Sequence, residues 1–214
     1  MGREDWYRRS TWSVVDQQDF LARLKRSRAS ANKAQYLRIQ ASYLAAAGNH
    51  TAAVELLDKL FLECPERLQL AEAHLQRALC LIELNQHQAT IEEFRASLQA
   101  QRDCPNVGTT CWLQFPWFIV QREDRALYDE ALAVLNEFRS DVSLTFPIDG
   151  YRYAAVRALI AEARGETDSA REFAKVALQC AEMSFSAFRY HPTVGLVEKV
   201  DPRIHGRLAA LVQV

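Results

Sequence analysis

Residues 34–67 read AQYLRIQASYLAAAGNHTAAVELLDKLFLECPER, and this stretch decides the fold class. Small and apolar residues recur at helical spacing on both sides of a central turn, at Ala41, Leu44, Ala53, Leu57 and Leu60. Gly48 can adopt the left-handed conformation that ends a helix, and Pro65 cannot continue the second helix. The pattern predicts a helix–turn–helix unit.

This unit resembles the tetratricopeptide repeat, a helical hairpin of about 34 residues. A second unit at 71–104 has the same scheme, and two further units are expected at about 109–141 and 151–184. The expected turn residues are Gly48, Asn85, Ala126 and Gly165. Pro116 is expected to interrupt the first helix of the third unit.

The segments that flank the repeats should cover the ends of the array. Ser13 and Asp16 form a serine–acid pair typical of a helix start, and a stripe at Phe20, Leu21 and Leu24 follows it. The predicted fold class is all-α, a tetratricopeptide-like α-solenoid of about four helix–turn–helix repeats with N- and C-terminal capping segments. The predicted parts are a basic and aromatic arm with a capping helix at 1–33, repeats at 34–184, and a loop with a capping helix at 185–214.

Composition excludes several classes of protein. The net charge of −1 argues against a nucleic-acid binder, and no apolar run is long enough to span a membrane. The charge is uneven, with +5 over residues 1–40 and −4 over residues 55–95, which could steer partners or could belong to two solvated faces. Five cysteines without close pairing fit a reducing compartment, so a cytoplasmic location is expected.

Motifs for catalysis, metal binding and cofactor binding are absent from the sequence. It contains no glycine-rich phosphate loop, no HExxH and no GxSxG, and the five histidines lack metal-ligand spacing. His50 and His87 occupy the same repeat position, which packing at the turn explains. We therefore predict no catalytic residues, no metal and no cofactor, and the alternative is an enzyme without recognisable motifs.

The resemblance implies a concave groove lined by the first helix of each hairpin. Transferring the family's groove positions gives candidate partner-binding residues at Gln35, Arg38, Ser42, Glu72, Leu79, Glu83, Val120, Glu123, Arg152, Leu159 and Glu162. A mixed-charge groove can bind a protein or can simply be hydrated. Some members of the family grip a peptide C-terminus with asparagines, whose positions hold Ser42 and Leu79 here, and this departure argues against that mode.

Aromatic residues offer a second set of candidates. Trp6, Tyr7 and Arg8 stand in a terminus that could pack on the first repeat or could reach a partner. Trp117 belongs to an aromatic cluster at 112–118 that could be core or interface.

These observations together predict a protein that binds another protein or peptide without catalysing a reaction. The N-terminal block DWYRRSTW…LKRSRASANKAQYLRIQ, within residues 5–40, also resembles the start of uncharacterised bacterial repeat proteins. Compact proteins of that kind sometimes act as immunity proteins that neutralise a toxin, so the chain is expected to be an adaptor or a toxin-neutralising protein. The alternative within the binding class is a self-associating structural protein whose aromatic surface forms a homodimer.

Overall fold

The computed structural model describes residues 5–139, 146–186 and 190–213, and every regular element in these ranges is helical. The predicted all-α class with helices in adjacent pairs is therefore confirmed. The chain folds as two compact units, Met1–Cys111 and Trp112–Val214, and each is considered by itself. No helix in the described ranges combines the length and apolar character needed to cross a bilayer.

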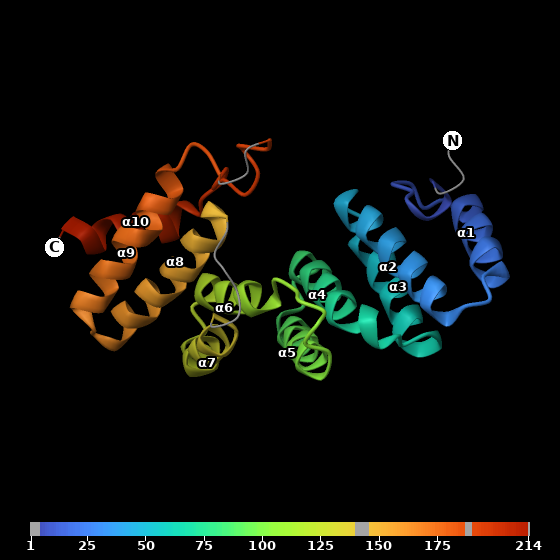
Figure 1. Ribbon diagram of the computed structural model, residues 1–214, viewed down its shortest axis with the longest axis horizontal. Helices are drawn as coiled ribbons and strands as arrows, with labels where there is room; N and C mark the ends of the chain where they lie inside the picture. The colour runs from blue at the N-terminus through green and yellow to red at the C-terminus, as the bar shows by residue number, and fades with distance from the viewer. Residues whose placement is uncertain (1–4, 140–145, 187–189, 214) are drawn as a thin grey trace. The chain divides into compact units, whose positions relative to one another are not determined.

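The first unit contains an N-terminal helix followed in the chain by two helical hairpins (Figure 1). Its elements are η1 (Asp5–Tyr7), α1 (Val14–Arg26), α2 (Ser30–Ala46), α3 (His50–Glu63), α4 (Arg67–Glu83) and α5 (His87–Asp103). Helix α2 packs on α3, α3 on α4, and α4 on α5, and one hydrophobic core extends from the first hairpin to α4.

The second unit repeats the hairpin scheme and ends with a helix of its own (Figure 1). Its elements are α6 (Cys111–Arg122, which starts on the last residue of the first unit), η2 (Arg125–Leu127), α7 (Tyr128–Arg139), α8 (Pro147–Arg164), α9 (Thr167–Glu182) and α10 (Pro202–Gln213). The predicted C-terminal helix after Asp201 is present as α10, and it packs on α9 and α8.

Four turns of one geometry organise both units. Each first helix ends at a residue with positive φ: Gly48 (81°), Asn85 (56°), Glu123 (55°) and Gly165 (76°). The next backbone N–H then donates to the carbonyl five residues before it, at 2.8 to 3.2 Å, in the pairs Asn49–Leu44, Gln86–Leu81, Asp124–Ile119 and Glu166–Ala161. This is the Schellman helix ending, and the second helical segment starts two residues after the left-handed residue in all four cases.

The third hairpin departs from the sequence-based prediction in two ways. Its left-handed residue is Glu123 rather than Ala126, which lies inside η2. Pro116 does not interrupt the first helix, because α6 runs through it. Proline removes one helical hydrogen bond at a cost of about 3 kcal/mol. Nine of the ten residues in 111–120 are buried, and this burial outweighs the local cost.

Small residues set the close approach of α8 and α9 in the second unit. Five alanines of these two helices have no solvent exposure: Ala154, Ala158, Ala170, Ala174 and Ala177. A methyl group placed on Gly150 would come within 2.8 Å of the Cys180 Sγ. The two backbones can therefore pack closely only because these side chains are small.

The N-terminal helix begins as predicted. The Ser13 side chain accepts a hydrogen bond from the Asp16 N–H, and the Asp16 carboxylate accepts one from the Ser13 N–H at 2.9 Å. Phe20 and Leu24 of α1 are buried in the core of the first unit, whereas Leu21 is 42% exposed. Helix α1 therefore covers the outer side of the first hairpin, as a capping segment should.

We expect the Gly165→Ala variant to have a free energy of unfolding lower by about 1 kcal/mol, because alanine is strained at φ 76°. A methyl group at this position meets no neighbouring atom, so the backbone conformation alone is tested. Urea denaturation followed by circular dichroism would measure the change.

Gly206→Ala is the matched control, because this glycine lies inside α10 with equally open space around it. Alanine is the better helix former, so this variant should be more stable by up to about 1 kcal/mol. A shift of the same sign in both variants would contradict the assigned role of the left-handed turn.

Candidate functional site

The first helices of the two N-terminal hairpins, α2 and α4, lie side by side in the first unit. Arg38 of α2 reaches across to α4, where its Nε donates to the Gln69 Oε1 at 2.7 Å. The side-chain amide of Gln76 is oriented so that its oxygen accepts a hydrogen bond from Arg38 Nη1 at 3.0 Å and its nitrogen donates one to the Arg38 carbonyl at 3.3 Å. Arg38 therefore acts as a polar bridge between the two hairpins.

One turn further along α2, the two helices leave a pocket of about 330 Å³. We name it the α2–α4 pocket, and its lining residues are Ala41, Ser42, Ala45, His50, Leu57, Gln76, Leu79, Cys80 and Glu83. Three of the predicted groove residues, Ser42, Leu79 and Glu83, line this one pocket. Leu79 is 39% exposed, so an apolar wall of the pocket faces solvent.

The α2–α4 pocket combines apolar walls with few polar groups. Burial, with a smaller contribution from Glu83, raises the pKa of the Cys80 thiol to about 11, so the thiol remains protonated at neutral pH. The Ser42 hydroxyl donates to the Ile39 carbonyl at 2.8 Å. Within the described ranges, the exposed Glu83 carboxylate makes no hydrogen bond or ion pair, and the buried His50 Nδ1 has no partner.

A second hollow of about 350 Å³ lies between α4 and α5. Its polar lining carries both signs of charge, with Arg67 and Asp103, and it also includes His74. The His74 Nδ1 is 2.8 Å from Glu93, which also pairs with Arg77 at 2.5 Å. Arg77 reaches Asp58 of α3 at 2.9 Å, so this network fixes α3, α4 and α5 to one another.

The remaining groove candidates of the first unit, Gln35 and Glu72, lie outside the α2–α4 pocket. Gln35 is exposed near the start of α2, and Glu72 is half-buried one turn before Gln76 on α4.

In the second unit the predicted acidic groove residues bind to the chain itself. Arg207 of α10 forms ion pairs with Glu123, at 3.1 Å, and with Glu162 of α8. Leu159 and Val120 are only 1% exposed, so neither is available on the surface.

Arg152 of α8 is half-buried beside Asp149. Burial lowers the pKa of the Arg152 guanidinium and raises the pKa of the Asp149 carboxyl, and each charge partly offsets the effect on the other. Trp117 is 9% exposed, with its ring 5.9 Å from that of Tyr151.

The aromatic arm at the N-terminus packs on its own unit. The Trp6 and Tyr7 rings lie 4.9 and 4.7 Å from the ring of Tyr36 on α2, and Tyr7 is 8% exposed. Arg8 is exposed, with its guanidinium 5.2 Å from the centre of the Tyr7 ring. Trp6 and Tyr7 therefore pack on the first repeat, which is one of the two alternatives that the sequence left open.

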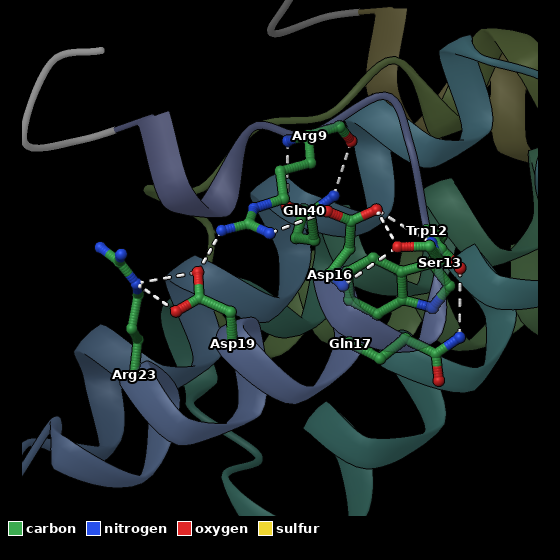
Figure 2. Close-up of polar contacts among 8 residues, drawn as sticks. All are labelled: Arg9, Trp12, Ser13, Asp16, Gln17, Asp19, Arg23 and Gln40. Carbon is green, nitrogen blue, oxygen red and sulfur yellow. Dashed lines mark hydrogen bonds and ion pairs between the residues drawn. The ribbon is translucent and has the colours of Figure 1, made fainter.

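Figure 2 shows how the arm is fastened. The fully buried Gln40 side chain accepts from the Arg9 N–H at 3.1 Å and donates to the Arg9 carbonyl at 2.7 Å. The Arg9 guanidinium pairs with Asp16, at 2.9 Å, and with Asp19 of α1. One arginine thus joins the arm to α1 by its side chain and to α2 by its backbone.

Sequence reasoning did not select His50, Gln76 and Cys80, although they line the same pocket as three selected residues. The repeat pattern could have pointed to His50, because His50 and His87 occupy the same position, two residues after the left-handed residue of their turns. No equivalent signal exists for Gln76 and Cys80, which read as ordinary helix residues.

A scan against protein-family models finds no match for the chain, and neither does a search of curated proteins. Within the described ranges, no three metal-binding side chains come together.

Acid should loosen the start of α1 and its ion pair with Arg9 of the N-terminal arm. Hydrogen bonds from Ser13, followed by smaller contributions from Thr11 and Arg9, hold the pKa of Asp16 at about 2, below its ordinary value of 3.8. A lowered folded-state pKa gives stability that is present above pH 4 and is lost as the pH falls toward 2. The indole N–H signals of Trp6 and Trp12, followed by NMR, should therefore change across this window.

Asp16→Asn removes one of the two carboxylates that pair with Arg9, so its arm signals should already be altered at neutral pH and should change less between pH 4 and pH 2. Asp168→Asn, which changes an exposed acid in the first turn of α9, is the control and should keep the wild-type profile. If the indole N–H signals of the wild type did not change between pH 4 and pH 2, the link between Asp16 and the arm would be refuted.

Proposed function

We propose that this chain is a protein-binding module that takes a segment of a partner protein at the α2–α4 pocket, without catalysing a reaction. The observation that carries the proposal is the gathering of Ser42, Leu79 and Glu83 around one pocket with apolar walls. A pocket of this kind, with a few polar groups at its edge, suits an anchoring side chain of a partner.

The construction of the site favours binding by a largely preformed surface. The Arg38 bridge and the His74–Glu93–Arg77–Asp58 network fix the helices around the pocket before any partner arrives. Binding to a preformed site loses little conformational entropy, so modest contacts can suffice. An adaptor or a toxin-neutralising protein would work in this way, by scaffolding or by occlusion.

The second unit supports the proposal by contrast. Its predicted acidic groove residues Glu123 and Glu162 are already paired with Arg207, and Leu159 is buried. Within the predicted groove, the first unit therefore offers a pocket with an unpaired carboxylate, whereas these acids of the second unit are neutralised by the chain itself.

Leu79→Glu should abolish capture of the partner while leaving the fold intact. The side chain is 39% exposed, so the substitution costs little core packing, but it places a charge in the apolar wall of the pocket. Tagged wild-type and variant proteins would be compared by affinity capture from the source organism with quantitative mass spectrometry, after circular dichroism has verified their helix content.

Leu68→Glu is the matched control, because Leu68 lies on the same helix, is 64% exposed and is outside the pocket. It should retain the partner that Leu79→Glu loses. A partner held equally by both variants would place the interaction on another surface. Recovery of the bait alone, as an oligomer by light scattering, would favour self-association.

A further inference from the structure

We propose that the α2–α4 pocket binds a lysine or arginine side chain of the partner, with its methylene stem against the apolar wall and its charged head on Glu83. This inference rests on the proposed function and specifies its chemistry. The occupant is a basic segment of another protein.

The shape and lining of the pocket suit a side chain that is apolar along its length and charged at its tip. Ala41, Ala45, Leu57 and Leu79 supply apolar surface, and Glu83 supplies a carboxylate. Lysine and arginine bury their methylene groups on apolar surface and keep the charge at the edge. A volume of about 330 Å³ leaves room for one such side chain.

The unpaired state of Glu83 decides between occupants. A purely apolar side chain would cover this carboxylate without providing a partner, which costs free energy. An acidic side chain would be repelled by Glu83 and by the net charge of −4 over residues 55–95. A cation satisfies the carboxylate by a charge-assisted hydrogen bond.

Arg38, the cation among the predicted groove residues of the first unit, does not fill this role. Arg38 is not among the lining residues, and its Nε and Nη1 already donate to Gln69 and Gln76. The second unit shows the same kind of carboxylate already paired with a cation, because Arg207 binds Glu162 near the end of α8. Glu83 is the last residue of α4 and has no such arginine in the described ranges.

The first test uses small probes on the full-length, isotope-labelled chain. Nα-acetyl-arginine amide and Nα-acetyl-lysine amide should shift the NMR signals of Ser42, Leu79 and Glu83. Nα-acetyl-norleucine amide, which lacks the charge, and Nα-acetyl-glutamate amide should bind at least about tenfold more weakly. Equal binding of the norleucine probe, or no shift with either cationic probe, would overturn the proposal.

Variants locate the charge that is responsible. Glu83→Gln should weaken the arginine probe about tenfold, and Glu83→Asp should retain part of the affinity. Glu55→Gln, which changes an exposed acid of α3 outside the pocket, should have no effect. Unchanged affinity in Glu83→Gln would refute the role of this carboxylate. The spectra also report whether each variant is folded.

Peptide selection separates the failure of this inference from the failure of the proposed function. Peptides from a random display library that bind the wild type but not Leu79→Glu should share one lysine or arginine position. Leu79-dependent peptides without a cation would overturn the inference and leave the binding function intact. The absence of any Leu79-dependent peptide would remove the proposed function and this inference with it.

Discussion

The left-handed residue at the end of each first helix is the constraint on which the rest of the structure depends. At this residue the chain leaves one helix, forms the six-to-one backbone hydrogen bond and starts the next helical segment two residues later. The geometry is the same at Gly48, Asn85, Glu123 and Gly165, although three residue types occupy these four positions. Because the turn fixes where each second helix begins, it also fixes which faces of the two helices meet, and the packing of each hairpin follows.

This constraint also explains how far the sequence could predict the fold. Glycine and asparagine are the residues that adopt positive φ at least cost, so three of the four turns were visible in the sequence. Glutamate carries no such signal, and Glu123 was therefore missed in favour of Ala126. Pro116 was read as an interruption because local propensity disfavours it, but the burial of its neighbours decides the outcome. Local signals predicted the hairpins, and tertiary packing determined the exceptions.

The candidate site was predictable to a smaller extent, because a helix face can be read from periodicity but its neighbours cannot. Ser42, Leu79 and Glu83 were found as positions on first helices, and the structure gathers them around one pocket. The same reasoning selected Glu123 and Glu162, yet an arginine 84 and 45 residues away in sequence pairs with them. Contacts of such separation, like the pairing of Arg9 with Gln40 in the arm, leave no trace in local spacing.

The two units therefore differ in whether an acidic residue near the end of a first helix is paired with a cation of the chain. In the second unit α10 returns over α8 and α9 and provides Arg207, so an ion pair forms within the chain. In the first unit the capping elements lie on the outer side of α2, where Gln40 and Tyr36 hold the arm, and they supply no cation to Glu83. A carboxylate without a partner beside apolar walls gains a charge-assisted hydrogen bond when a cation binds it. The chain provides that cation in the second unit, and in the first unit a basic side chain of a partner would supply it by the same physical chemistry.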